Sequence, residues 1–300
     1  MTLQQLRQVL TIAESNSMNE AAKKLFVSQP NLSATVREVE EELGITVFMR
    51  NNRGITVTAE GEEFLGYAKQ VVEQYHLLEN RYLNVESKKK FSVSMQHYSF
   101  AVKAFVQLAK EVGMDEYEFA VHETKTKEVI DNVKNLKSEI GVLYLSDFNE
   151  KVLRKLFKEC DIEFKELFTC NTYVYLWKKH PLAGQKEITL DDLQEYPCLT
   201  FEQGVNNSFY YAEEMMSTYE YKRVIKADDR ATMLNLMVGL NGFTLCSGII
   251  SEDLNGDDYA AIPLKESEKM HIGYIKHKGT KLSKLGEIYI DALKNYENKV

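Results

Sequence analysis

The sequence of 300 residues has little of what would place it outside ordinary globular proteins. It contains four prolines and four cysteines, and no two cysteines form a C-x-x-C pair, so neither a disulfide framework nor a zinc ribbon is expected. No run reaches about 18 consecutive apolar residues. The N-terminus, MTLQQLRQVL, lacks the basic and apolar regions of a signal peptide. These absences predict a cytoplasmic protein with free thiols and no membrane span.

An excess of positive charge is also missing. The formal net charge is -8, yet residues 1–90 contain 11 Lys and Arg against 12 Asp and Glu, so the acidity lies beyond residue 90. Affinity for nucleic acid comes largely from clustered Lys and Arg, so the charge permits DNA binding by a local basic face without indicating it. A composition that is 44% hydrophobic and 27% charged can form hydrophobic cores. The length predicts two domains.

Three helices are predicted in the first 43 residues. Apolar residues at helical spacing indicate a first helix over 3–13, a capping box opens a second over 18–25, and Ser28 caps a third from about 29 to 43. The third helix has its apolar residues on one side, at Leu32, Val36, Val39 and Leu43. Its opposite side is therefore expected to face outward.

The second and third helices with their tight turn form a helix-turn-helix in outline, and an ordinary helical hairpin is the alternative. The next part of the chain favours DNA binding, because residues 45–48 and 54–58 are β-like runs around a polar turn, as in a two-stranded wing. Arg50 and Arg53 on this wing suit contact with phosphate or with the minor groove.

Residues 59–85 form one long helical run, which would extend about 40 Å. Its apolar residues have the spacing of a and d positions over three heptads, which predicts pairing with a second copy of the chain. Packing of this stripe onto the helix's own domain is the alternative. The polar cluster 87–90 marks the domain boundary. The residues of the dimerising stripe are Phe64, Ala68, Val71, Tyr75, Leu78 and Tyr82.

Beyond residue 90, predicted strands alternate with predicted helices. Strands at 91–96, 117–121 and 140–145 are separated by helices at 100–112 and 127–136, and this βαβαβ order implies a parallel sheet.

A second set of alternating elements begins after residue 163 and includes a helix from about 207 to 218. We therefore expect two α/β lobes, with a ligand in the cleft between them at the carboxyl ends of the strands. Lobe I comprises about 91–163 and 267–300, and lobe II about 164–266.

Residues 19–33, Asn-Glu-Ala-Ala-Lys-Lys-Leu-Phe-Val-Ser-Gln-Pro-Asn-Leu-Ser, resemble the helix-turn-helix of LysR-type transcriptional regulators, whose core reads A-A-x-x-L-x-x-S-Q-P/S-x-[LV]-S. The resemblance continues through 39–44, 47–50 and 56–61. It extends more weakly to the end of the chain, through His180-Pro-Leu-Ala183 and Val238-Gly-Leu-Asn-Gly-Phe243. One departure is Ala34, where the family commonly has Arg.

The resemblance implies an α/β protein with an N-terminal all-α winged helix-turn-helix at 1–58, a dimerising linker helix and hinge at 59–90, and a two-lobed effector domain at 91–300. This domain would resemble periplasmic solute-binding proteins, and the chain would assemble as a homodimer or homotetramer.

The residues that the resemblance assigns to DNA contact belong to the third helix and the wing: Ser28, Gln29, Pro30, Asn31, Ser33, Thr35, Arg37, Arg50 and Arg53. Gln and Asn can pair with adenine edges, while Arg chiefly anchors phosphate. Thr35 or Arg37 is expected to supply the contact that Ala34 lacks. Ser28 has the alternative role of capping the helix without touching DNA.

The family's inducer pocket lies between the lobes, near helix N-termini whose free N–H groups favour anions. Here it would be lined by two strand ends of lobe I and one segment of lobe II: Gln96, His97, Tyr98, Ser99, Thr124, Thr126, Thr200, Phe201, Gln203 and Asn206. The predicted ligand is a small anionic metabolite, with Ser99 and Thr126 as hydrogen-bonding groups. Bulky residues replace the family's small ones at 96–98, which leaves the ligand's identity open.

The roles of one histidine and two cysteines in this region each have two possible interpretations. His97 is either a pocket residue or a histidine at the surface or hydrogen-bonded in the core. Cys198 and Cys246 invite comparison with peroxide-sensing relatives, but neither has a nearby partner in the sequence, which favours buried structural thiols.

The leading hypothesis is a ligand-responsive transcription factor that binds an interrupted palindrome as a dimer, with RNA polymerase as a further expected partner and with no cofactor, metal or membrane. The alternative is a solute-binding or catalytic α/β module whose N-terminal helices serve only oligomerisation. G-x-S-x-G, P-loop and H-E-x-x-H motifs are absent, so no enzyme is expected. The effector, the operator and the direction of regulation are not specified by the sequence.

Overall fold

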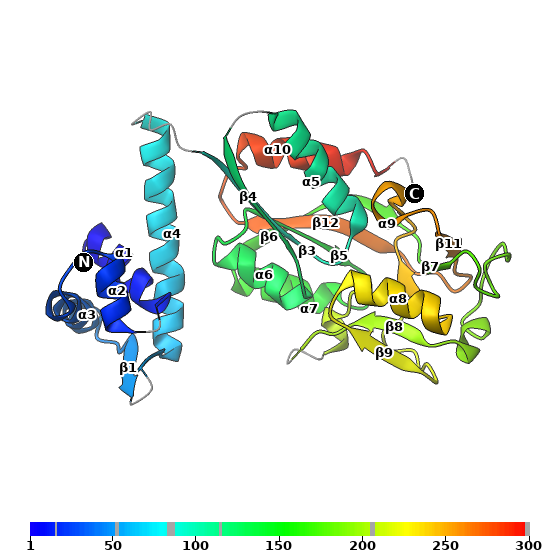
Figure 1. Ribbon diagram of the computed structural model, residues 1–300, viewed down its shortest axis with the longest axis horizontal. Coiled ribbons are helices and arrows are strands. Elements are labelled where there is room, and N and C mark those ends of the chain that lie inside the picture. Colours follow the sequence, from blue (N-terminus) through cyan, green and yellow to red (C-terminus); the bar gives the residue numbers. More distant parts are fainter. Residues whose placement is uncertain (16, 52–53, 83–87, 114–115, 205–207, 298–300) are drawn as a thin grey trace. The chain divides into compact units, whose positions relative to one another are not determined.

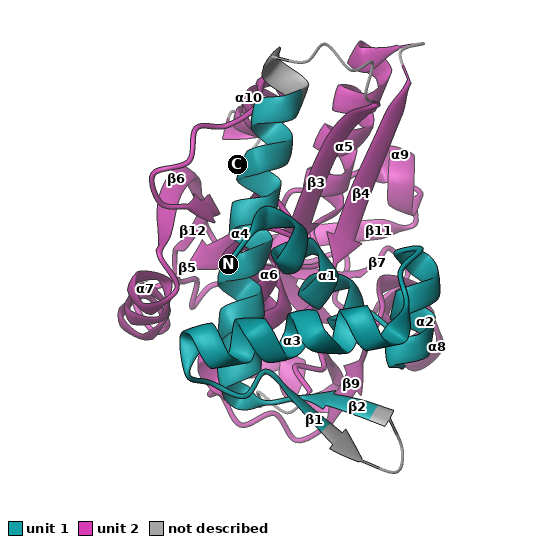
Figure 2. Cartoon of the chain, turned by 90° about the vertical axis from the view of Figure 1, so that its left-hand side faces the viewer, with its two compact units in different colours: residues 1–87 teal, residues 88–300 magenta. Residues whose placement is uncertain are grey.

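The computed structural model describes residues 1–15, 17–51, 54–82, 88–113, 116–204 and 208–297 (Figure 1). For 50–51, 54 and 80–82 it describes the backbone alone. The chain divides into two compact units, residues 1–87 and 88–300, coloured separately in Figure 2.

Unit 1 begins with three short helices whose first turns are capped by side chains. They are α1 (Leu3–Ala13), α2 (Met18–Lys24) and α3 (Gln29–Leu43). Thr2 and Gln5 form a reciprocal capping box, and the Ser17 hydroxyl accepts a hydrogen bond from the Glu20 N–H. Gly44 ends α3 in the left-handed region at φ 71°, which costs a glycine little. The helices predicted from the sequence are thus confirmed to within one residue.

A two-stranded antiparallel wing comes after α3 and is formed by β1 (Phe48–Asn51) and β2 (Gly54–Val57). The first strand begins later than predicted because residues 45–47 connect it to α3. The Glu40 carboxylate fixes this connection by accepting hydrogen bonds from the Val47 and Phe48 N–H groups, at 2.7 and 3.0 Å.

The long helix α4 (Ala59–Tyr82) comes next and is capped by Thr58, whose hydroxyl accepts from the Gly61 N–H at 2.9 Å. Gly61 lies so close to the wing connection that a Cβ there would collide with the Val47 carbonyl oxygen. This close approach explains the glycine at this point of the sequence.

Unit 2 contains a five-stranded mixed sheet, which forms lobe I in the order β4-β3-β5-β12-β6 (Figure 1). The strands are β3 (Lys89–Met95), β4 (Tyr117–Glu123), β5 (Ile140–Leu145), β6 (Ile162–Cys170) and β12 (Met270–His277). The helices of this lobe are α5 (Ser99–Val112), α6 (Thr126–Lys134), α7 (Glu150–Glu159) and α10 (Lys284–Lys294). The predicted parallel arrangement is confirmed for β3, β4 and β5, whereas β12 runs antiparallel between β5 and β6.

Lobe II is inserted between β6 and β12, so lobe I extends to residue 170 and not to the predicted 163, because β6 pairs with β12. It consists of a three-stranded antiparallel sheet, a parallel strand pair and short helices. The sheet has the order β10-β7-β11, from β7 (Tyr173–Trp177), β10 (Thr244–Cys246) and β11 (Tyr259–Pro263). The pair is β8 (Cys198–Phe201) with β9 (Val224–Ala227), and the helices are α8 (Arg230–Leu240) and α9 (Glu252–Asn255), with a 3₁₀ helix at Asp192–Glu195.

The predicted helix at 207–218 is wrong for the residues that the structure describes. Only Phe209–Tyr211 is helical, as one 3₁₀ turn, and the segment continues through turns to residue 218. Met216 has a φ of 55°, a left-handed conformation that a continuous α-helix excludes. The irregular backbone lets the consecutive side chains of Glu213, Glu214 and Met215 all be buried.

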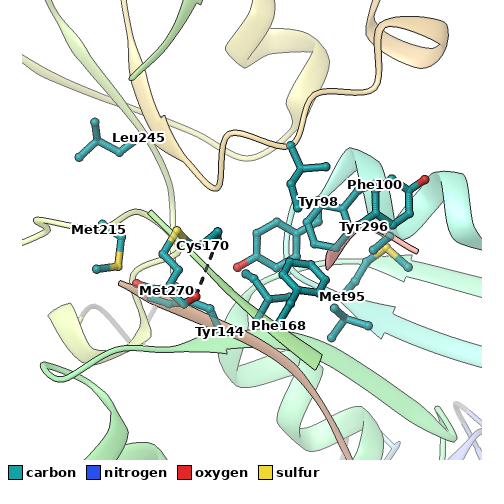
Figure 3. Close-up of a cluster of buried hydrophobic side chains, with 14 of the residues drawn as sticks. Met95, Tyr98, Phe100, Tyr144, Phe168, Cys170, Met215, Leu245, Met270 and Tyr296 are labelled. Atoms are coloured by element: carbon teal, nitrogen blue, oxygen red, sulfur yellow. Dashed lines mark hydrogen bonds between the residues drawn. The ribbon is translucent and has the colours of Figure 1, made fainter. Parts of the chain in front are cut away.

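The two lobes share one hydrophobic core. Tyr98 and Phe100 of lobe I stack at 5.0 Å between ring centroids, and Met215 and Leu245 of lobe II belong to the same buried cluster (Figure 3). Unit 2 is therefore continuous across the lobes. In the described part of the chain, no helix is both long and apolar enough to cross a membrane.

Candidate functional site

The outward side of α3 carries the residues predicted to contact DNA. Leu32, Val36 and Val39 are buried beneath the helix. The predicted contact residues are exposed, namely Ser28, Pro30, Asn31 and Arg37, or half-buried, namely Gln29, Ser33 and Thr35. The Ser28 hydroxyl accepts from the Asn31 N–H at 3.3 Å, so its capping role is confirmed, and its exposure leaves it open to a ligand as well.

Gln29 is fixed by the helix on which it lies. Its Nε2 donates to the Ser33 hydroxyl, one turn further along, at 2.8 Å. The side-chain amide of Gln29 is thereby already oriented, so a hydrogen bond from it to a ligand would cost less side-chain conformational entropy. On the wing, Arg53 and the side chain of Arg50 lie outside the described residues.

Phe26, in the turn between α2 and α3, is a surface residue that the sequence pattern did not single out. This side chain is 97% exposed and its backbone has a φ of 55°. An apolar ring so fully exposed contributes nothing to the core of unit 1. It lies two residues before the helix cap Ser28, so the exposed surface at the start of α3 includes an aromatic group.

The predicted stripe on α4 is divided between two environments. Ala68 is buried with Leu6 of α1, and Phe64 packs against the same cluster. Val71 and Leu78 are 52% and 56% exposed, and Tyr67 and Leu77 add further exposed apolar surface. The alternative of packing within its own unit therefore describes the first part of the stripe, while the later part is left uncovered.

Two further residues complete this stripe. Tyr75 is 39% exposed, with the Arg7 guanidinium carbon 5.4 Å from the centre of its ring. The side chain of Tyr82 lies outside the described residues.

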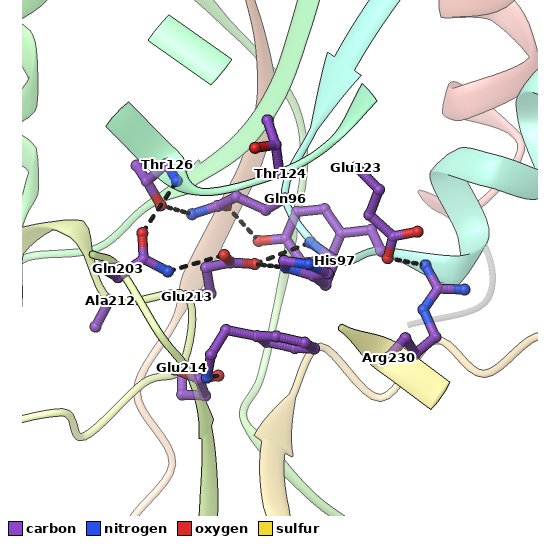
Figure 4. Close-up of polar contacts among 12 residues, drawn as sticks. Gln96, His97, Glu123, Thr124, Thr126, Gln203, Ala212, Glu213, Glu214 and Arg230 are labelled. Carbon is purple, nitrogen blue, oxygen red and sulfur yellow. Dashed lines mark hydrogen bonds and ion pairs between the residues drawn. The ribbon is translucent and has the colours of Figure 1, made fainter. Parts of the chain in front are cut away.

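A polar network joins the two lobes at the strand ends where the pocket was predicted (Figure 4). At its centre is the carboxylate of Glu213, which is 6% exposed. One carboxylate oxygen accepts from the His97 backbone N–H at 2.9 Å and from its Nδ1–H at 2.8 Å. The other oxygen accepts from the Gln203 amide at 2.9 Å. Glu213 of lobe II thus accepts hydrogen bonds from the two N–H groups of His97, which precedes α5 in lobe I.

The first turn of α6 is bonded in a similar way. The Thr126 N–H donates to the Gln203 side-chain oxygen at 3.1 Å, and its hydroxyl donates to the Tyr211 carbonyl at 2.7 Å. Gln96 donates to the Thr126 hydroxyl at 2.6 Å, and the Tyr98 hydroxyl donates to the Gln96 oxygen at 2.9 Å. These predicted pocket residues do lie together, but they are bonded to one another.

His97 combines its two alternatives, because it is hydrogen-bonded and buried and also lines the cavity described below. Its side chain is 6% exposed, and its ring stacks on Phe201 at 3.7 Å between centroids. A residue from each lobe therefore contributes to this stack.

The neighbouring acid, Glu214, accepts from the Phe201 N–H at 2.8 Å. Burial, and then the nearby charge of Glu213, raise the pKa of the Glu214 carboxyl to about 8. This carboxyl is therefore mostly protonated at neutral pH. Arg230 of α8 also bridges the lobes, through an ion pair with Glu123 at the end of β4.

Beside this network, a cavity of about 80 Å³ lies between the lobes. Its lining includes four of the residues predicted for the pocket, His97, Tyr98, Ser99 and Phe201. The lining residues that sequence reasoning missed come from lobe II and β12, among them Glu213, Glu214, Arg230, Met233, Thr244, Leu245 and Met270.

The remaining predicted pocket residues lie elsewhere. The Thr124 hydroxyl bonds the Glu128 carboxylate, Thr200 borders a separate hollow within lobe II, and Asn206 lies outside the described residues.

All four cysteines are free thiols. Burial raises the pKa of Cys170 and Cys246 to about 12 and raises that of Cys198 further. Reactive cysteines need a lowered pKa, so these residues have the character of structural thiols, as expected.

Comparisons with known proteins agree with this arrangement. The family model described as bacterial regulatory helix-turn-helix protein, lysR family, matches residues 3–62, and that of the LysR substrate binding domain matches residues 114–297. The HTH-type transcriptional regulator CysL of Bacillus subtilis is 25% identical, with 98% of each chain covered. The transcriptional dual regulator GltC of the same organism is 30% identical over 68% of this chain and 66% of its own.

Among solved structures, a full-length OxyR variant from Pseudomonas aeruginosa has a TM-score of 0.67 at 19% identity, covering 98% of both chains. CbnR, a LysR family transcriptional regulator, has a TM-score of 0.59 at 17% identity, covering 98% of this chain and 99% of its own. These two likenesses concern the fold alone.

Proposed function

The chain belongs to the LysR family of bacterial transcriptional regulators, and from this premise we propose how its two units act. It is a DNA-binding transcriptional regulator with a C-terminal effector-binding domain, and regulators of this family bind DNA and small-molecule effectors and form oligomers. In our proposal, α3 of each protomer enters the major groove of one half of an interrupted palindrome. A small molecule in the cleft between the lobes changes that binding.

The exposed side of α3 carries the DNA-binding part of this proposal. It combines the amide of Gln29 with that of Asn31, both suited to adenine, and the cation of Arg37, suited to phosphate. The start of α3 lies at the surface, where the helix dipole favours phosphate, although Pro30 has no N–H and the Asn31 N–H is bonded to the Ser28 hydroxyl.

The exposed part of α4 supports assembly into a homodimer. Tyr67, Val71, Leu77 and Leu78 are each more than half exposed on a helix of 24 residues. A helix exposing such apolar surface is stabilised by pairing with another helix. A dimer also explains how two copies of α3 would meet two half-sites.

The network across the lobes supports the effector role of the cleft. Glu213 and Arg230, both in lobe II, bond His97 and Glu123 of lobe I. A molecule in the adjoining cavity would alter the balance of these contacts, and so favour one arrangement of the lobes over another. The protein is in this view a non-enzymatic regulator that acts in the cytoplasm, with RNA polymerase as a further partner. No observation favours the alternative of a catalytic module.

Selection of bound DNA from a random duplex library tests the proposal. The full-length protein should enrich an inverted repeat, whereas a Gln29→Ala/Asn31→Ala variant should lose the enrichment, because base-edge contacts specify sequence. The exposed residue Lys278 of unit 2 provides the control, since Lys278→Ala should enrich the same repeat. Enrichment of no sequence by the parent, or the same repeat by the double variant, would contradict the assignment of α3.

A further inference from the structure

Two of the donors at which an anionic effector was expected are already used by the chain. The His97 N–H, ahead of α5, donates to Glu213, and the Thr126 N–H at the start of α6 donates to Gln203. A ligand that used these two groups would first have to displace two buried side chains. Other polar groups of the cleft are therefore better placed to bind it, on the premise of the effector role proposed above.

Two such groups lie on the lobe II wall of the cavity. Thr244, on β10, is 7% exposed, and its hydroxyl makes no hydrogen bond to any described residue. Arg230, at the start of α8, bonds Glu123 through one terminal nitrogen, but its buried Nε–H has no acceptor among the described residues. Buried donors without acceptors are costly, so their presence in a cavity wall indicates a ligand atom that accepts from them.

These two groups lie on the same side of the cavity. Thr244 is paired directly opposite Tyr175 in the sheet of lobe II. Arg230 lines the same cavity from the start of α8. Tyr175 also lines the cavity. Arg230, Thr244 and Tyr175 thus form one surface, which we call the donor wall.

The rest of the cavity limits the ligand's size and polarity. Met233, Leu245, Ile249 and Met270 line it and are each less than a tenth exposed. Its volume of about 80 Å³ is roughly half that of a cavity that accommodates benzene. A molecule of a few non-hydrogen atoms fills such a space, and one end of it must be apolar.

Two acids also line the cavity, but their environment reduces repulsion of an anion. Glu213 is compensated by three donors from His97 and Gln203. Glu214, with its pKa raised to about 8, is mostly neutral at pH 7. Neither acid therefore presents a full, uncompensated negative charge to the donor wall.

We propose that the effector is a short-chain carboxylate, whose oxygens accept from the Arg230 Nε–H and the Thr244 hydroxyl and whose alkyl end packs on Met233 and Met270. The site thus differs from the helix N-termini expected from the sequence. It also explains why Arg230 keeps one N–H unused while it bridges the lobes.

Calorimetric titration of the full-length protein tests the ligand class. The probes are acetate, propionate and isobutyrate, each compared with its amide and with the amine of the same carbon skeleton. At least one acid should bind, its amide should bind about tenfold more weakly, and its amine should not bind, because a charged acceptor forms the stronger hydrogen bonds. Failure of all three acids to bind, or tighter binding of an amine, would overturn the proposal.

Variants test the site itself. Thr244→Val removes the hydroxyl while keeping the shape, and Arg230→Lys keeps the charge while removing the Nε–H. Each should weaken binding of the acid about tenfold or more. Tyr221→Phe is the matched control, since it removes another buried hydroxyl that has no partner among the described residues and lies outside this cavity. Unchanged affinity in both cavity variants would refute the donor wall.

A parallel measurement of DNA binding separates this proposal from the proposed function. If other compounds alter operator binding while no acid binds, the ligand class is wrong and the regulatory role stands. If an acid binds through Thr244 but changes no DNA binding, the site stands and the effector role of the cleft is wrong.

Discussion

The two units build their candidate binding surfaces in opposite ways. In unit 1 the predicted DNA contacts of α3 fall within one run of 15 residues, and each is placed by the helix that carries it. In unit 2 the cleft joins His97 to Glu213, 116 residues away in the sequence, and Glu123 to Arg230, 107 residues away. A surface of the first kind can be altered one residue at a time. A surface of the second kind changes as a whole, because each bond also holds two lobes together.

The largest expected effect concerns the dimer interface that we propose for α4 of unit 1. Leu78→Asp places a charge on the exposed apolar part of α4, which we propose to be a dimer interface. Losing the second half-site should weaken operator binding by about a hundredfold or more, because linked sites gain affinity from high effective concentration. Analytical ultracentrifugation should show a shift to monomer. Gln74→Asp, an exposed polar position of the same helix, is the control, and an unchanged mass for Leu78→Asp would refute the interface.

The next effect concerns the long-range character of unit 2. Glu213→Leu should lower the free energy of unfolding of this unit by about 3 kcal/mol, because it leaves the buried donors of His97 and Gln203 without an acceptor. The single tryptophan, Trp177 in β7, reports unfolding of unit 2 by fluorescence in urea. Glu220, an exposed acid further along the same segment, gives the matched variant Glu220→Leu, which should change the urea midpoint of unfolding little. Equal shifts in the two variants would show that the network does not stabilise the lobes.

A smaller effect sharpens the description of unit 1. Gln29→Ala should reduce the discrimination between operator and random DNA by about 1–3 kcal/mol, since a bidentate base contact would be lost. Arg37→Ala should weaken binding to both DNAs alike, because phosphate contacts carry little sequence information. Fluorescence anisotropy at two salt concentrations measures both. Equal loss on the two DNAs for Gln29→Ala would assign Gln29 to anchoring.

An effect of comparable size is a pH dependence confined to unit 2. The pKa of Glu214 is about 8, above its ordinary value of 4.5, so the folded state binds the proton more tightly than the unfolded state does. Stability from this group is therefore present at low pH and is lost as the pH rises toward 8. Between pH 6 and 8 the parent should lose about 2 kcal/mol more than Glu214→Gln.

Urea titration followed by Trp177 fluorescence measures this difference. The exposed acid Glu220 again gives the control, and Glu220→Gln should follow the parent. Parallel pH profiles for Glu214→Gln and the parent would show that Glu214 is ionised throughout.

The same contrast explains what could be predicted from the sequence. The bounds of α3 follow from signals within it, a serine cap, an apolar stripe and a terminal glycine, so no distant residue is needed. The strand β5 was also predictable, because all six of its residues are buried and apolar or glycine. By contrast, β6 was missed, since its charged and half-buried residues at an edge of the sheet obscure the alternation expected of a strand.

The cleft was only partly predictable, for a related reason. The strand ends that carry His97 and Thr126 could be located, because parallel strands bring their carboxyl ends to one edge. The partners of these residues could not, because Glu213 lies in the segment where a helix was expected and where Met216 has a left-handed backbone. Nothing in the local sequence indicates that the buried carboxylate of Glu213 would accept hydrogen bonds from His97, which comes after β3. Thr244 and Arg230 likewise could be recognised as candidate binding residues only from the structure, which shows their unbonded polar atoms in the wall of the cavity.

The position of β12 in the sheet of lobe I has a consequence for how the chain folds during synthesis. This strand lies between β5 and β6, yet it is made only after the whole of lobe II, at residues 270–277. A ribosome adding about 5–20 residues per second needs several seconds or more to travel from the end of β6 to the end of β12. Throughout that time β5 and β6 each lack their neighbour on that side, and their open edges can pair with other chains. Lobe II can form during this interval, whereas the sheet of lobe I is completed only when β12 has been made, so the edges of β5 and β6 facing β12 stay open until then.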